Sequence, residues 1–166
     1  GYSEKRTLLG FSTAGELFGL GVWSEYGYNS MEGVDDYQEL LLGVDYTLEG
    51  GTYLMAEWYR NSSGKADKDA YTLNDWMRYL SRERKTIARD QVYGLVQLPV
   101  TDLINTGISS ILSPTDGSVT LLPTLNWSAF ENVDIMAYLN IYLGSEGSVY
   151  NSNLGNGGLV RARVYF

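Results

Sequence analysis

The segment from Val133 to Leu143 alternates apolar and polar side chains over eleven residues without interruption. Successive side chains of a β-strand point to opposite faces, so this pattern predicts a strand with one apolar and one polar face. Eleven residues is about the length that a tilted strand needs to cross a bilayer, and about twice that of an ordinary globular strand. This length is the first indication of a membrane β-barrel.

The same alternation recurs along most of the chain. We expect eight further strands at 6–13, 16–27, 37–49, 52–60, 91–100, 103–112, 118–130 and 158–166. We expect short turns at 13–15, 49–51, 100–102 and 131–132, and longer polar or glycine-rich loops at 28–36, 61–90, 113–117 and 144–157. Short and long connections that alternate are typical of an up-and-down meander with two different rims.

One segment, 71–87, has the 3.6-residue apolar period of a helix, and it lies inside the longest expected loop. Thr72 followed by Asp75 resembles a capping box at its start. Basic residues gather here: five of the chain's twelve lie within twelve positions, namely Arg78, Arg82, Arg84, Lys85 and Arg89. This loop could fold into an acidic lumen as a constriction, lie outside against lipopolysaccharide phosphates, or be a solvated loop helix.

Composition excludes several classes of function. The chain has no cysteine and no histidine, so thiolate metal sites are excluded, and the commonest metal ligand and the usual general base at neutral pH are absent. We expect no metal, no cofactor and no catalytic residue. The net charge of −8 would repel a nucleic-acid backbone, so nucleic acid is not an expected partner. The longest apolar run, 40–44, is too short for a transmembrane helix.

The last nine residues end in an aromatic ring, with an apolar or small residue at every second position before it. These residues are Gly158, Val160, Ala162, Val164 and Phe166. This segment resembles the closing strand of Gram-negative outer-membrane β-barrel proteins of the porin type. The resemblance implies an all-β, antiparallel, up-and-down transmembrane β-barrel in the bacterial outer membrane. It also implies contact with lipid and lipopolysaccharide and recognition by the barrel-assembly machinery, and it is compatible with a homo-oligomer.

Counting strands backward from a last strand that ends at the periplasmic rim sets the direction of each one. Outward aromatic residues then form two girdles, which membrane interfaces favour. We expect Tyr46, Trp127 and Phe166 near the periplasmic rim and Tyr26 and Trp58 near the outer rim.

Nine strands would start the chain at the outer rim, whereas bacterial barrels normally have an even number of strands. Two alternatives follow. Either 6–13 is not a membrane strand and the chain is a complete eight-stranded barrel, or residues 1–166 are the C-terminal part of a larger barrel. The alternation in 6–13 favours the larger barrel.

The same phasing points a set of charged side chains inward. The expected lumen-lining residues are Glu25, Glu39, Asp45, Glu57, Asp134, Arg161 and Arg163. We therefore expect a passive channel for ions or small solutes with an acidic lumen, and no enzyme. The alternative is a small closed structural or adhesion-type barrel that acts through its surface loops. A soluble ligand-binding barrel with inverted faces is disfavoured by strand length.

Overall fold

The computed structural model describes residues 6–31, 34–81 and 83–166. It contains nine β-strands, one α-helix and two short 3-10 helices. The strands are β1 (Arg6–Leu17), β2 (Leu20–Met31), β3 (Val34–Thr47), β4 (Tyr53–Asn61), β5 (Asp90–Thr101), β6 (Ile104–Ser113), β7 (Ser118–Phe130), β8 (Val133–Leu143) and β9 (Gly157–Val164). The helices are η1 (Lys68–Ala70), α1 (Leu73–Leu80) and η2 (Ser152–Leu154).

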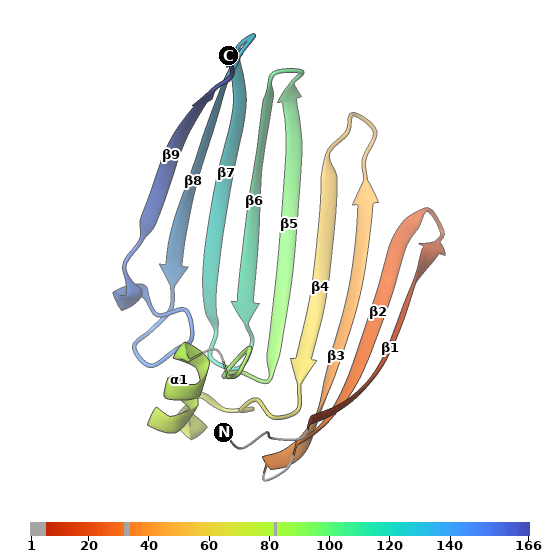
Figure 1. Ribbon diagram of the computed structural model, residues 1–166, viewed down its shortest axis with the longest axis vertical. Helices are drawn as coiled ribbons and strands as arrows, with labels where there is room; N and C mark the ends of the chain where they lie inside the picture. The colour runs from red at the N-terminus through yellow and green to blue at the C-terminus, as the bar shows by residue number, and fades with distance from the viewer. Residues whose placement is uncertain (1–5, 32–33, 82) are drawn as a thin grey trace.

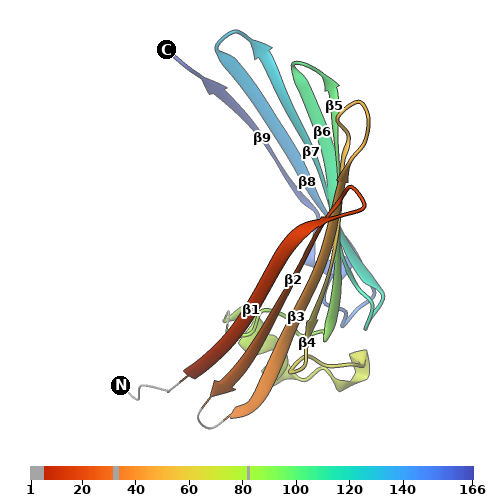
Figure 2. The same ribbon diagram turned by 90° about the vertical axis from the view of Figure 1, so that its right-hand side faces the viewer.

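All nine strands form one antiparallel sheet in chain order, from β1 to β9 (Figure 1). This confirms the predicted all-β, up-and-down arrangement. The sheet is twisted and open, with β1 and β9 at its opposite edges (Figure 2). The described residues therefore do not form the complete closed barrel that was one of the two alternatives.

The two ends of the sheet differ, and we call them the turn end and the loop end. The turn end carries the connections after β1, β3, β5 and β7, and the loop end carries those that include α1 and η2. Because the number of strands is odd, β1 and β9 run in the same direction, from the loop end to the turn end. Pairing these two edges with each other would make a parallel pair.

The first two predicted connections were wrong. β1 continues through the expected turn at 13–15, and the chain reverses at Phe18 and Gly19, both with positive φ. A two-residue hairpin turn needs this conformation, and Asn-Gly or Asp-Gly is its usual signal, so Phe-Gly escaped recognition. The expected loop at 28–36 is mostly strand, because β2 extends to Met31 and β3 begins at Val34. The remaining turns and loops are close to their predicted positions.

The predicted helix over 71–87 is real but shorter. Thr72 and Asp75 form the expected capping box, and α1 ends at Leu80. Beyond α1 the chain forms backbone hydrogen bonds with Lys65 instead of continuing the helix. The Lys65 N–H donates to the Ile87 carbonyl at 2.8 Å, and the Arg89 N–H donates to the Lys65 carbonyl at 2.9 Å. These tertiary contacts outweigh the helical pattern after Leu80.

The buried apolar residues lie in the loops. The only buried apolar side chains among the described residues are Ile87, Ala88, Val149 and Tyr150. They come from the 61–90 and 144–157 connections, and Tyr71, Trp76, Tyr79, Ile111 and Tyr142 pack around them. We call this group the loop cluster. It holds α1 and the long loops against the loop end of the sheet.

Candidate functional site

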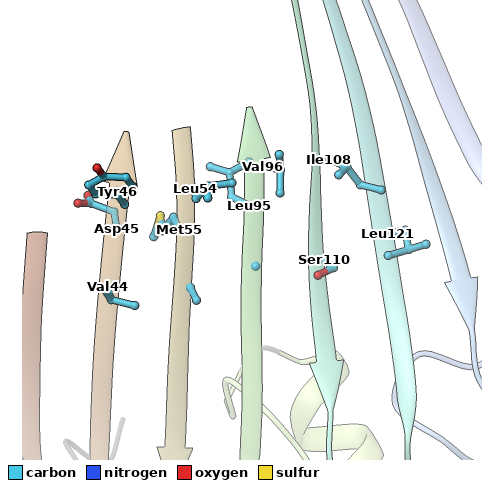
Figure 3. Close-up of a pocket in the computed structure, with 12 residues that line it drawn as sticks. Val44, Asp45, Tyr46, Leu54, Met55, Leu95, Val96, Ile108, Ser110 and Leu121 are labelled. Atoms are coloured by element: carbon cyan, nitrogen blue, oxygen red, sulfur yellow. The ribbon is translucent and has the colours of Figure 1, made fainter. Parts of the chain in front are cut away.

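Strand pairing divides the side chains of the sheet into two faces. One face, which we call the apolar face, is mainly hydrophobic, although Arg60 and Asp90 form an ion pair at its loop end. It includes Leu9, Phe11, Leu40, Leu42, Val44, Val96, Ile108, Leu121, Ile135, Leu139, Val160 and Val164. Many of these side chains are exposed, such as Leu139 at 54%. A shallow hollow of about 350 Å³ lies on this face between β3 and β7, and Figure 3 shows the residues that line it. An exposed apolar surface of this extent is rare in a soluble monomer.

The aromatic residues predicted to form girdles, where they have strand partners, share the apolar face. Tyr46 and Trp127 lie near the turn end, as expected. Trp58 lies toward the loop end of β4 and pairs with Val92 near the start of β5, also as expected. Tyr26 lies near the middle of β2, where it pairs with Leu40, so it is farther from the loop end than expected, because β2 extends beyond its predicted limit.

The opposite face, the polar face, gathers the charged residues that the sequence pattern selected. All seven of them share it: Glu25, Glu39, Asp45, Glu57, Asp134, Arg161 and Arg163. They do not form one cluster. The four carboxylates on β2, β3 and β4 make an acidic sector, whereas Asp134 and the arginines lie on β8 and β9.

The four carboxylates of the acidic sector are evenly spaced along the strand direction. Glu25 pairs with Leu41 and Glu57 pairs with Gly43, so the four carboxylates occupy the levels of residues 39, 41, 43 and 45 on β3. Two residues of strand rise correspond to about 7 Å, so the carboxylates extend over roughly 20 Å from the loop end toward the turn end.

Ring donors hold three of these carboxylates, and the sequence analysis missed them. Trp23 Nε1 donates to Glu57 at 2.9 Å, the Tyr53 hydroxyl donates to Asp45 at 2.8 Å, and the Tyr59 hydroxyl donates to Glu39 at 2.5 Å. Neutral donors fix a carboxylate without neutralising its charge. The sector is therefore ordered and still negative.

A glycine makes one of these contacts possible. Trp23 reaches Glu57 across β3 at Gly43, where a Cβ atom would lie only 2.0 Å from the indole ring. Gly43 lies between Leu42 and Val44 within the predicted strand. A glycine inside a strand often marks a place where another group comes close to the backbone, so this contact could have been predicted.

The long loop folds over the loop end of the polar face. Ile111 and Tyr142, which belong to this face, pack against the loop cluster, and Gln91 Nε2 donates to the Tyr150 hydroxyl at 3.0 Å. Lys85 Nζ reaches the Glu39 carboxylate at 2.8 Å. Glu25, Glu39 and Lys85 border a hollow of about 440 Å³.

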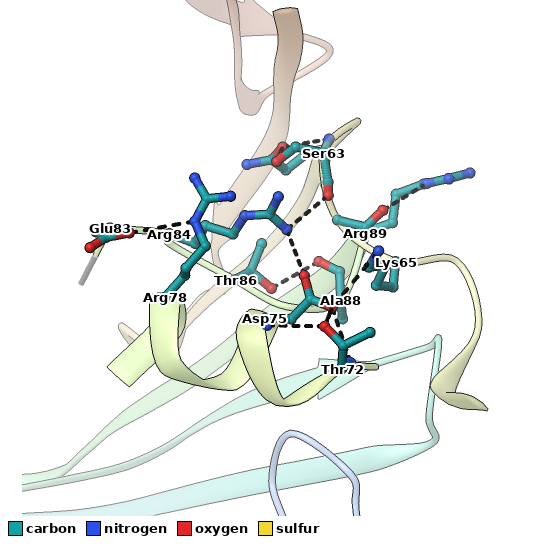
Figure 4. Close-up of polar contacts among 12 residues, drawn as sticks. Ser63, Lys65, Thr72, Asp75, Arg78, Glu83, Arg84, Thr86, Ala88 and Arg89 are labelled. Carbon is teal, nitrogen blue, oxygen red and sulfur yellow. Dashed lines mark hydrogen bonds and ion pairs between the residues drawn. The ribbon is translucent and has the colours of Figure 1, made fainter. Parts of the chain in front are cut away.

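The five predicted basic residues do not act as one group. Arg78 pairs with Glu83 at 3.4 Å, and Arg84 pairs with the buried Asp75 at 3.2 Å (Figure 4). Arg89 donates weakly to the Gly64 carbonyl at 3.5 Å, and Arg82 lies outside the described residues. Lys85 is the member of the set that reaches a carboxylate of the acidic sector.

Two acids hold the long loops in place, the buried Asp75 and the half-buried Asp116. Asp75 receives hydrogen bonds from Thr72 and ion pairs from Lys65 and Arg84. Burial alone would raise the pKa of Asp75, but these hydrogen bonds and positive charges lower it below its usual value.

Asp116 holds the 144–157 connection in place in the same way. It accepts from the Val149 backbone at 2.8 Å and from the Tyr71 hydroxyl at 3.1 Å, which joins both long loops to one carboxylate. Burial opposes its ionisation, yet hydrogen bonds from Ser118 and Val149 lower the pKa of Asp116.

The residues of the predicted assembly signal lie on and beyond the edge strand. Val160, Ala162 and Val164 of β9 share the apolar face, and Phe166 follows the strand at the turn end. The register therefore agrees with the alternation on which the resemblance rests.

Within residues 6–31, 34–81 and 83–166, no helix has the length and hydropathy needed to cross a membrane. The same residues contain no group of three or more acidic side chains placed to hold a metal ion. No protein-family model, curated protein or solved structure matches this chain.

Proposed function

We propose that this chain is part of a bacterial outer-membrane β-barrel that works as a porin-like passive channel. The observation that carries the proposal is the separation of the two faces over nine strands. The apolar face would meet lipid, and the polar face would line a water-filled lumen. Terminal-strand recognition by the barrel-assembly machinery and contact with lipopolysaccharide belong to the same proposal.

The open sheet favours the larger of the two barrels considered. Since β1 and β9 run in the same direction, a barrel made only of antiparallel pairs requires an odd number of further strands between them. We propose that residues 1–166 contribute one wall of such a barrel. The loop end would face outward, and the turn end would face the periplasm.

The acidic sector makes cations the preferred solute. Its carboxylates keep their charge beside neutral ring donors, and Lys85 is the one cation that reaches them among the described residues. Charges along a low-dielectric wall concentrate counter-ions, so the lumen would concentrate cations and exclude anions. The loop cover would narrow the outer entrance, with Lys85 opposite Glu39.

Reversal potentials of the full-length barrel that contains this chain, measured across a planar bilayer under a salt gradient, test this function. Neutralising Glu39, Asp45 and Glu57 together should shift the reversal potential toward anions. The shift should fade as salt rises, because the Debye length falls from about 10 Å at 0.1 M to about 3 Å at 1 M. A matched control neutralises three exposed acids in the turn-end connections, Glu49, Asp102 and Glu131. Absence of conductance from the well-folded full-length barrel, with and without residues 71–87, would refute the channel.

A further inference from the structure

A separate polar hollow lies at the turn end of the polar face, far along the strands from the loop cover. Its volume is about 490 Å³. Two cross-strand rows border it: Asn105, Asn126, Met136 and Arg161 in one row, and Ser128, Asp134 and Arg163 in the next. We call this hollow the turn-end site.

Two arginines and two acids, Asp102 and Asp134, border the turn-end site. No ion pair within the described part of the chain involves Arg161 or Arg163. Asp134 instead accepts from Ser128 Oγ at 2.9 Å and from the Tyr165 hydroxyl at 3.1 Å. Arg163 Nη1 donates to the same Tyr165 hydroxyl at 3.4 Å, so this hydroxyl links Arg163 to Asp134 without a direct ion pair. Arg161 and Arg163 are two residues apart on β9, which corresponds to about 7 Å along the strand.

An acceptor of the same site also lacks a partner. The Oδ1 atom of Asn105 is buried and receives no hydrogen bond. A buried acceptor is nearly always paired, because leaving it unpaired forfeits its hydration without compensation. Asn105 shares its row with Arg161 and borders the same hollow, so the missing donor would enter beside the arginines.

We propose that the turn-end site binds a small organic anion that carries a carboxylate or phosphate group and, next to it, a hydroxyl or ammonium donor. Arg161 and Arg163 would bind the anionic group, because a guanidinium matches the geometry of these oxygens. Asn105 Oδ1 would accept from the neighbouring donor. Arg161 and Arg163 would repel a free cation.

The volume suits this class of ligand. Sites for small molecules commonly enclose about 300 to 1,000 Å³ and combine a few placed polar groups with apolar walls. Pro99, Leu103 and Met136 supply apolar surface around the polar rows. This proposal goes beyond the proposed channel, because binding at the site does not require conduction.

The test is a ligand-observed NMR titration of the full chain in detergent micelles, with lactate and acetate as probes. Lactate has a hydroxyl beside its carboxylate and acetate does not, so lactate should bind more tightly. Arg161→Gln and Arg163→Gln should each raise both dissociation constants roughly tenfold. Arg78→Gln, at the opposite end of the sheet, is the matched control and should leave both constants unchanged.

A second variant tests the hydrogen bond between the ligand's donor and Asn105. Asn105→Leu removes the unpaired acceptor and should abolish the preference for lactate while acetate binds as before. Circular dichroism of each variant establishes that the sheet is folded. Unchanged binding in folded Arg161→Gln and Arg163→Gln, or no binding by wild type, overturns the site. Equal wild-type constants for lactate and acetate overturn the role of Asn105. A protein that binds but does not conduct would refute the channel alone.

Discussion

The loop cluster and the sheet differ in how far their apolar side chains are buried. The loop cluster encloses Ile87 and Ala88 completely, as a core does in a water-soluble protein. Among the sheet residues whose burial the structure describes, no apolar side chain is buried, and Phe11 and Val160 are 66% and 75% exposed. Hydrophobic burial is the main favourable term in folding, so the sheet needs a cover that the described residues do not supply.

This difference predicts how substitutions should destabilise each part. Changes in the loop cluster should act as they do in a soluble core, through lost packing, and should stay local to the loops. Changes on the apolar face should depend on the surrounding medium, and in the proposed barrel that medium is lipid.

The largest effect is expected from Ile87→Ala. It removes the centre of the loop cluster and should lower the free energy of opening of residues 61–90 by about 2 to 5 kcal/mol. Hydrogen exchange of these residues measures the opening, while the strands should keep their protection. Leu73→Ala, at a site that is 75% exposed on α1, is the control and should change little. Equal opening in both variants would show that the cluster does not anchor the loop.

The next effect tests the face assignment. Leu139→Arg on the apolar face should reduce the free energy of unfolding in lipid vesicles by roughly 2 to 4 kcal/mol if this residue meets lipid at mid-depth. Asn140→Arg on the polar face should cost much less, because water can solvate the new charge. Greater damage from Asn140→Arg would invert the two faces.

Most of the sheet followed from its alternation, because a period of two is a property of each strand alone. Errors in strand ends did not disturb it: β2 ran from residue 20 instead of 16, yet Glu25 still shares a face with Glu39. This tolerance explains why the polar-face residues could be named together from the sequence. Cross-strand pairing then placed them on separate sectors, and no local pattern contains that information.

The contacts that depend on the fold were not predictable. Trp23 reaches Glu57 across 34 positions of sequence, and Asp116 joins Tyr71 to the backbone of Val149. The end of α1 at Leu80 depends on pairing between Lys65 and the segment after the helix. In each case a distant segment competes with the local preference and prevails.

The smallest expected effect concerns Asp75 and Asp116, the acids that hold the loops in place. Opening of the loops should depend on the charge of these acids, and therefore on pH, whereas the strands should not respond in this way. Thr72→Ala removes a capping contact of Asp75 and should lower the free energy of loop opening by about 1 kcal/mol at neutral pH.

The pH dependence has a defined sign. Asp75 and Asp116 have pKa values lowered by folding, so their contribution is complete above the ordinary value of 3.8 and is lost as the pH falls through the lower, folded value. Hydrogen exchange should therefore show the loops opening more readily below about pH 4. Asp75→Asn should open more easily at neutral pH and respond less to acid. Asp69→Asn, exposed on η1, removes the same charge without these contacts and should behave as wild type. An acid response that Asp75→Asn leaves undiminished would assign the pH sensitivity to other groups and remove Asp75 from the fastening of the loop.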